Sequence, residues 1–97
     1  MRRGDLYAYQ AISRTRTVLI VSADELTAAG RPIVIDVSDV APTGVRSLLA
    51  VPIAGHGHAL VYRITDVDPA RLIEHLGVAD PAAMDAISMS LSVALGL

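Results

Sequence analysis

Short apolar runs separated by turn-forming residues set the pattern of this 97-residue chain. The runs are rich in Val, Ile and Leu, and glycine, proline, aspartate or serine stands between most of them. Runs of this length and composition are typical of β-strands. They predict five strands and a candidate sixth, at Leu6–Ala11, Thr17–Ser22, Pro32–Ser38, Leu48–Ile53, Ala59–Thr65 and Ile73–Val78.

Beyond residue 80 the apolar positions change to a helical period. Asp80 suits an N-cap and Pro81 suits the first helical position. Residues 23–31 and 39–46 are expected to be loops, the first with a possible helical turn. We therefore expect a single domain over residues 1–97: mostly β, a small SH3-like barrel of five or six strands closed by a C-terminal α-helix from Pro81 to Leu95. The apolar stripe of that helix is Met84, Ile87, Leu91 and Leu95.

The composition indicates that the domain associates with a second protein chain. Hydrophobic residues make up 53% of the chain, whereas a domain of this size buries only about 60–65% of its unfolded surface. Some apolar surface should remain for a second copy, so we expect a homodimer in which the helix and a neighbouring strand contribute. No apolar run approaches the roughly 20 residues that cross a bilayer. We expect no membrane association and a cytoplasmic location.

Charge is distributed unevenly although the formal net charge is only −2. Residues 1–16 carry four arginines against one aspartate, a balance of +3, and residues 64–85 carry five acids against one arginine, a balance of −4. The segment 13–17 is expected to be a hairpin turn that holds Arg14 and Arg16 at one edge of the sheet. Such an edge favours a phosphate or an acidic partner.

The order Arg-Gly-Asp-Leu-Tyr followed by Arg-Thr-Val-Leu-Ile-Val-Ser-Ala-Asp resembles the opening of the MazF/PemK family of toxins. The resemblance implies the toxin of a type II toxin–antitoxin system, a sequence-specific, metal-independent endoribonuclease. Its products would carry 2′,3′-cyclic phosphate and 5′-hydroxyl ends. It also implies a single-stranded RNA substrate, a cognate antitoxin protein and no cofactor.

The resemblance places the catalytic residues at Arg16 and Ser38. Arg16 precedes the apolar second strand, where the family has its catalytic arginine, and Ser38 ends the third strand, where the family has threonine or serine. A guanidinium can bind two phosphate oxygens and stabilise the developing charge, and a hydroxyl can donate to the same oxygens. An arginine stays protonated at neutral pH and is therefore a poor general base. The candidate RNA-binding residues are Arg3, Arg14, Tyr9, Thr43 and Arg63.

Two histidines in the turn between the fourth and fifth strands offer another chemistry. His56 and His58 could act as acid and base in RNA cleavage, or ligate a metal, since an imidazole titrates near neutral pH. Only two ligands are visible, and neither the MazF/PemK family nor the CcdB gyrase poisons, which share its fold, use histidines at this turn. A solvated hairpin is the preferred interpretation, so we predict no metal site.

Other segments resemble the CcdB gyrase poisons, which share the same fold. These segments are Tyr7-Ala8-Tyr9, Ile64-Thr65-Asp66-Val67, the short first hairpin and the ending Leu95-Gly96-Leu97. The gyrase-binding tryptophan of that family is replaced by Leu95, and hot spots of this kind favour tryptophan. The alternatives to a ribonuclease are therefore a gyrase poison, or a catalytically degenerate member that only binds an antitoxin.

Overall fold

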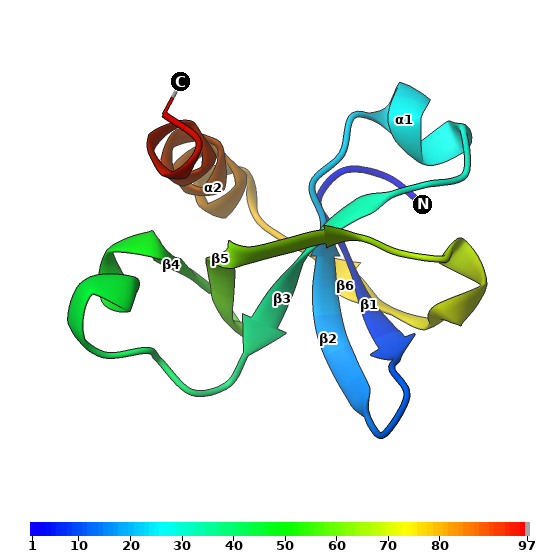
Figure 1. The fold of residues 1–97 in the computed structure, drawn as a ribbon, viewed down its shortest axis with the longest axis horizontal. Coiled ribbons are helices and arrows are strands. Elements are labelled where there is room, and N and C mark those ends of the chain that lie inside the picture. The colour runs from blue at the N-terminus through cyan, green and yellow to red at the C-terminus, as the bar shows by residue number, and fades with distance from the viewer. Residues whose placement is uncertain (97) are drawn as a thin grey trace.

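Six strands form one antiparallel sheet in the order β4-β5-β3-β2-β1-β6 (Figure 1). The computed structural model describes residues 1–96. Two helices and two short 3₁₀ segments complete the fold: α1 (Asp24–Ala28), α2 (Pro81–Ala94), η1 (Gly44–Leu49) and η2 (Pro69–Arg71). The strands are β1 (Asp5–Gln10), β2 (Thr15–Ile20), β3 (Ile33–Ser38), β4 (Ala50–Ile53), β5 (Gly57–Asp66) and β6 (Leu72–Val78).

The sheet curls into a barrel-like shape without closing. β5 is long enough to pair with β4 through its first half and with β3 along most of its length, and its register against β3 shifts between Ile35 and Asp36. The edge strands β4 and β6 each pair with a single neighbour. The expected SH3-like barrel with a terminal helix is thus confirmed in architecture, with an open seam between the two edges.

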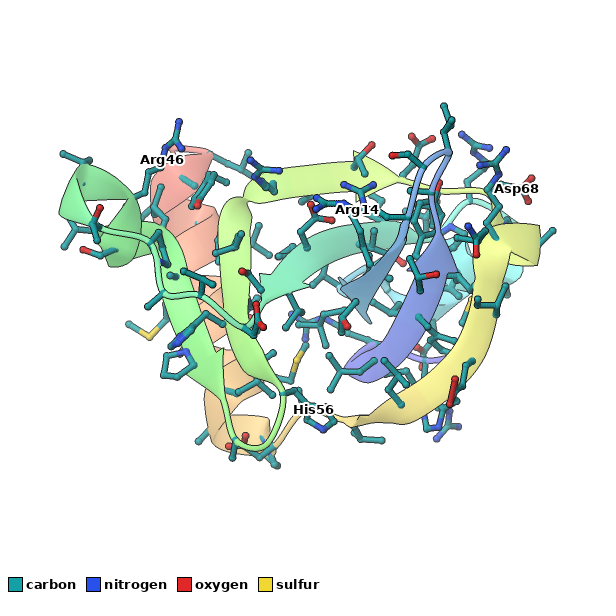
Figure 2. All side chains as sticks on the ribbon, turned by 90° about the horizontal axis from the view of Figure 1, so that it is seen from below. Arg14, Arg46, His56 and Asp68 are labelled. Atoms are coloured by element: carbon teal, nitrogen blue, oxygen red, sulfur yellow. The ribbon has the colours of Figure 1, made fainter. Side chains whose placement is uncertain are left out.

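One side chain bridges this seam. His56, in the β4–β5 hairpin, lies over Gly77 of β6, and a Cβ atom at Gly77 would stand 3.0 Å from His56 Nε2. Figure 2 shows His56 in the gap between the hairpin and β6. The two edges of the sheet therefore meet at a ring packed on a glycine.

The period of two along the strands gives the sheet two apolar faces. One face packs against α2 and contains Leu19, Ile35, Val61 and the fully buried Ile87 of the helix. The opposite face carries a smaller cluster of Val18, Ile20, Val34 and Val67, flanked by Tyr7, Tyr9 and Leu72. Arg16 is two residues from Val18 on β2, and Asp36 is two residues from Val34 on β3. Both charged side chains therefore stand on the face away from α2.

Helix α2 begins as the sequence predicts. The Asp80 carboxylate accepts a hydrogen bond from the Ala83 amide at 3.2 Å, and Pro81 occupies the first turn. The helix ends at Ala94 with Leu95 as its C-cap. No helix among residues 1–96 is long and apolar enough to cross a membrane.

Two local expectations need correction. Leu48 and Leu49 belong to η1, so strand β4 begins only at Ala50. Arg16 stands within strand β2, because the turn covers residues 11–14 only.

Two segments expected to be loops contain short helical elements. Residues 24–28 form helix α1, in the segment where a helical turn is expected. In η1, Ser47 Oγ donates to the Gly44 carbonyl at 2.6 Å, and Arg46 lies 5.5 Å from the centre of the Tyr62 ring.

Candidate functional site

An open groove of about 480 Å³ lies on the sheet face away from α2, across strands β2, β3 and β5. It combines positive, negative and hydroxyl groups in one place. Its floor comes from the middle of the sheet, and its walls come from the β1–β2 and β4–β5 hairpins. Its charged and polar lining includes Arg14, Arg16, Asp36, Ser38, Asp39, His56 and Arg63.

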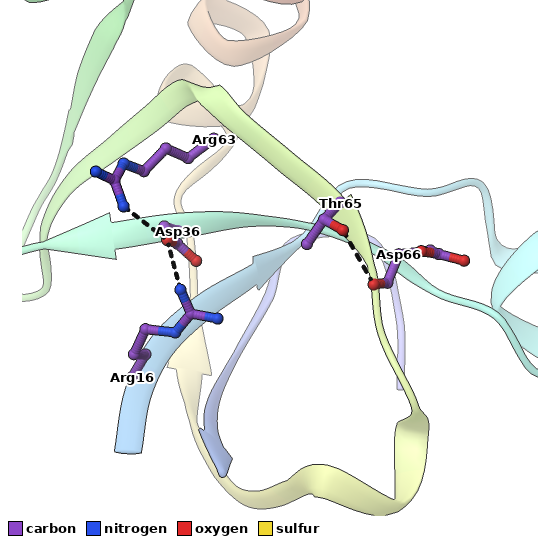
Figure 3. Close-up of polar contacts among 5 residues, drawn as sticks. All are labelled: Arg16, Asp36, Arg63, Thr65 and Asp66. Atoms are coloured by element: carbon purple, nitrogen blue, oxygen red, sulfur yellow. Dashed lines mark hydrogen bonds and ion pairs between the residues drawn. The ribbon is translucent and has the colours of Figure 1, made fainter. Parts of the chain in front are cut away.

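Arg16 is held on the groove floor by two neighbouring strands. Tyr9 stands opposite it on β1, with the guanidinium carbon 5.6 Å from the centre of the ring. Its Nη1 donates to Asp36 Oδ2 at 3.2 Å (Figure 3). Its Nε is buried and has no hydrogen-bond partner among residues 1–96. The side chain is thus fixed at one nitrogen and keeps donors unused.

Asp36 lies at the centre of the site, although sequence reasoning did not single it out. It faces Val18 of β2 and Leu60 of β5 across the ladder, both apolar, and its side chain is only 14% exposed. Arg63 Nη1 stands 3.9 Å from the same Oδ2 atom that Arg16 contacts. The signal that could have revealed it is one acidic residue inside the apolar run Ile33–Ser38.

Ser38 ends β3 beside this ion pair. Its Oγ accepts a hydrogen bond from the Val40 amide at 3.1 Å. Because that bond uses a lone pair of the oxygen, the hydroxyl proton remains free to donate. Ser38 also faces the β4–β5 hairpin closely: a methyl group at Gly57, whose φ is +116°, would overlap the Ser38 carbonyl. Glycine is therefore required where the hairpin approaches the end of β3.

A second hollow of about 540 Å³ adjoins the groove at the β1–β2 hairpin. Arg14 and Arg16 line both hollows, and Tyr9 and Arg71 line the second. Arg71 Nη1 donates to the Gln10 carbonyl at 3.3 Å and so ties η2 to the hairpin. The candidates Arg14, Arg16, Tyr9 and Arg63 thus come together around two connected hollows.

Two candidates lie elsewhere. Arg3 donates from Nε to the Val21 carbonyl at 3.1 Å and from Nη2 to Ser88 Oγ of α2 at 2.7 Å. It ties the N-terminal segment to the helix on the other side of the sheet. Thr43 is exposed as the N-cap of η1 and does not line the groove.

The histidines behave differently from one another. His56 is half-buried and lines the groove, so its ring is less exposed to water than a solvated hairpin implies. His58 belongs to β5 and pairs with Ser38 and Pro52. Within residues 1–96, no group of three or more His, Cys, Asp or Glu side chains is arranged to hold a metal ion.

Comparison with known proteins shows which fold and which family the chain has. The chain matches a mycobacterial endoribonuclease solved in complex with its cognate antitoxin, with a TM-score of 0.90 and 22% identity over 100% of this chain and 96% of that one. It also matches a MazE–MazF complex from Deinococcus radiodurans, with a TM-score of 0.86 and 19% identity over 100% and 97% of the two chains. No curated protein sequence matches it.

These structural matches establish the fold. The family is established by sequence: the model of the PemK-like, MazF-like toxins of type II toxin–antitoxin systems matches residues 2–95, which is nearly the whole chain. The resemblance noted at Arg3–Tyr7 and Arg16–Asp24 is thereby confirmed. This protein belongs to the PemK-like, MazF-like toxins of type II toxin–antitoxin systems.

Proposed function

We propose that this toxin is a metal-independent endoribonuclease that cleaves single-stranded RNA in the groove across β2, β3 and β5. One observation carries the proposal: Arg16 and Ser38 lie on adjacent strands and line the same groove as Arg63. A phosphodiester there would meet two guanidinium groups and a hydroxyl. The endoribonucleases among its structural matches support the same class of reaction.

The reaction would be an internal transesterification. The ribose 2′-oxygen attacks the adjacent phosphorus, the bond from phosphorus to the 5′-oxygen breaks, and a 2′,3′-cyclic phosphate and a 5′-hydroxyl result. Arg16 would stabilise the negative charge that grows on the phosphate oxygens. The Ser38 hydroxyl would donate a hydrogen bond to one of these oxygens. The groove is open, so water would accept the 2′ proton and protonate the leaving 5′-oxygen.

RNA on either side of the scissile bond would follow the positive side chains of the hairpin. Arg14 would contact a neighbouring phosphate, and the exposed part of Tyr9 would stack with a base. Arg63 would share the scissile phosphate with Arg16. Arg3 takes no part in this arrangement because its guanidinium is bonded to Val21 and Ser88.

We infer that the cognate antitoxin blocks the same groove in the cytoplasm. A disordered, acidic tail would fold along the arginine-lined hollows and exclude RNA. The antitoxin complexes among the structural matches support a partner of this kind. A tail peptide of the antitoxin should raise the apparent Kd for RNA in a competition assay. Binding of the peptide without any loss of RNA affinity would exclude a shared groove.

We infer further that two copies pair through the exposed side of α2 and through η1, which leads into β4, a strand that packs against α2. Met89 and Val93 of α2 are exposed one helical turn apart, and Val45 and Leu48 of η1 are exposed as well. In sedimentation at tens of micromolar, about the scale of weak specific association, the wild type should be a dimer and Val93→Glu a monomer. The matched control is Ile73→Glu on β6, which should stay dimeric. A wild type that sediments only as a monomer would refute this pairing.

The function is tested by incubating purified protein with RNA in EDTA and analysing the ends. Cleavage in EDTA with 2′,3′-cyclic phosphate ends is the expected result. Toxicity without RNA cleavage, together with stalled gyrase on DNA, would instead identify a gyrase poison. A protein that binds the antitoxin but neither cleaves RNA nor stalls gyrase would be a degenerate member of the family.

A further inference from the structure

Asp36 occupies an unusual place for an acidic residue. It stands on β3, which has a hydrogen-bonded strand on each side, and its cross-strand partners are Val18 and Leu60. Its carboxylate is largely withdrawn from water, with 14% of the side chain exposed. Withdrawing a carboxylate from water is unfavourable unless cations or donors compensate. The compensation here comes from the two arginines of the groove.

Both arginines converge on the same oxygen of Asp36. Arg16 Nη1 lies 3.2 Å and Arg63 Nη1 lies 3.9 Å from Oδ2 (Figure 3). The two guanidinium groups come from β2 and β5, on opposite sides of β3. Like charges brought this close repel one another. A negative charge between them offsets the repulsion and allows both to face one point of the groove.

The contact with Asp36 leaves most of the Arg16 fork unused. Only Nη1 is engaged, and Nε has no partner among residues 1–96. Figure 3 shows Nη1 turned toward Asp36 and the other terminal nitrogen turned away. A guanidinium binds phosphate best through two parallel N–H groups. Asp36 therefore holds the guanidinium at one corner, while the outer edge formed by Nη2 and the second N–H of Nη1 stays available for a ligand.

We infer that Asp36 is a positioning residue for RNA cleavage, which holds Arg16 and Arg63 together as a clamp for a single phosphate. This inference rests on the function proposed above. Asp36 does not touch the reacting atoms. It fixes the direction of Arg16 before RNA binds, so that the transition state meets a guanidinium already in place.

This role has two opposite consequences. The negative charge of Asp36 lies in the groove that takes the RNA phosphate, so it weakens binding of the substrate in its ground state. The fixed direction of Arg16 stabilises the transition state more than the ground state. Removal of the charge should therefore tighten RNA binding and slow cleavage at the same time. A residue needed only for folding would not separate these two quantities in opposite directions.

The test compares Asp36→Asn with Asp66→Asn. Both substitutions remove one carboxylate that pairs with an arginine, but Asp66 pairs with Arg31 outside the groove. For Asp36→Asn we expect a Kd for an uncleavable 2′-deoxy substrate about fivefold lower, because the substitution removes the repulsion between one negative charge and the phosphate, about 1 kcal/mol at contact distance in water. We expect kcat to fall about 10- to 100-fold, as for a misplaced catalytic group. Asp66→Asn should change neither quantity, and Asp36→Glu should recover part of kcat.

A second measurement does not depend on activity. The NMR signal of the Arg16 Nε–H group reports how rigidly the guanidinium is held, and it should show a high order parameter in the wild type and a low one in Asp36→Asn. If wild-type protein cleaves no RNA, the proposed function fails, while this measurement still decides whether Asp36 fixes the Arg16 guanidinium.

The inference is overturned by any of four results. Faster cleavage by Asp36→Asn would mean that Asp36 only competes with the phosphate for the arginines. Weaker RNA binding together with slower cleavage, or unchanged kinetics, would also contradict the inference. The fourth such result is an Arg16 order parameter that the substitution does not alter.

Discussion

Two arginine–aspartate pairs in this molecule have the same chemistry and opposite settings. Arg31 and Asp66 meet at the surface, where the Asp66 carboxylate receives Nη2 at 2.7 Å and Nε at 3.2 Å, and the two side chains are 61% and 55% exposed. Arg16 and Asp36 meet in the groove at 3.2 Å, with 31% and 14% exposed. The pair with the better geometry is the one in water.

The difference shows why geometry alone does not identify a functional pair. An exposed ion pair contributes about 0–1 kcal/mol because water and salt screen it. The groove pair is incomplete: one nitrogen of Arg16 is bonded and another is buried without a partner. An arginine with unused donors in a partly dry site is suited to bind an anion. The surface pair differs because Arg31 already binds Asp66 through Nε and Nη2, and water screens the rest of its charge.

The largest effect should come from Arg16→Ala against Arg31→Ala. Loss of a positioned donor typically costs about 10²–10³ in rate, so Arg16→Ala should cut kcat by that factor with the fold intact by circular dichroism. Arg31→Ala should cleave at the wild-type rate. Equal rates for both variants would remove Arg16 from the mechanism.

Adding one methyl group at Gly57 tests how much stability depends on the close packing of the β4–β5 hairpin against Ser38. Gly57→Ala places a Cβ against the Ser38 carbonyl at a φ of +116°, whereas Gly55→Ala in the same hairpin has φ +80° and no atom within 4 Å. Backbone strain of this kind costs about 1–3 kcal/mol. Gly57→Ala should lose more unfolding free energy than Gly55→Ala in urea titrations, and it should also slow cleavage by moving Ser38. Equal losses would show that the close approach to Ser38 has no energetic weight.

Ser38→Ala should be milder than Arg16→Ala. The substitution removes one neutral donor to the phosphate, worth about 0.5–1.5 kcal/mol, so we expect kcat to fall by up to about tenfold in single-turnover assays. The nearby Ser47→Ala, whose hydroxyl bonds the Gly44 carbonyl outside the groove, is the control. A complete loss of cleavage in Ser38→Ala would instead indicate that the Ser38 hydroxyl acts as a nucleophile or a general acid.

The histidines should contribute less. In the proposed mechanism Arg16 and Ser38 need no imidazole, so the double variant His56→Ala with His58→Ala should retain cleavage within a fewfold of wild type. Its rate should keep the same pH dependence between pH 5 and 8, the range in which imidazoles titrate. A dead double variant would assign acid–base catalysis to His56, which lines the groove.

The smallest effect should be on the pH dependence of stability, through the surface pair of Arg31 and Asp66. The hydrogen bond from Arg31 and its charge hold the pKa of Asp66 below the ordinary value of 3.8. A depressed pKa stabilises the folded state at neutral pH, and this contribution disappears as the pH falls through the pKa of the folded state. Asp66→Asn should therefore be slightly less stable than wild type at pH 7 and equal to it at the acid limit. A difference that persists in strong acid would have another origin.

The sequence predicted most of the fold because strand patterns are local. Thr17–Ser22 and Pro32–Ser38 are runs of branched residues, and their pairing as β2 and β3 brings Arg16 near Ser38. The family resemblance suggested the catalytic roles that we propose for Arg16 and Ser38. The site residues that escaped prediction depend on register and on distant contacts.

Asp36 shows the dependence on strand register, and Arg3 shows the dependence on contacts between distant parts of the chain. Whether Asp36 faces the groove or the core depends on the register of β3 against β2 and β5, and a shift of one residue would reverse its direction. Arg3 belongs to the basic N-terminal segment, but its hydrogen bond to Ser88 joins residues at opposite ends of the chain. No local pattern in the sequence reports such a contact.

The pairing of β1 with β6 also governs when this protein can finish folding. Asp5 stands opposite Val78, so the first strand of the chain must wait for the last strand to be synthesised before its outer edge is covered. Strands β2, β3 and β5, which carry the groove, are complete once Asp66 has been made. Pairings between such distant segments form slowly because a long loop must be closed first. A nascent chain on the ribosome can thus assemble its groove while Tyr7 and Tyr9 still lie on an open edge.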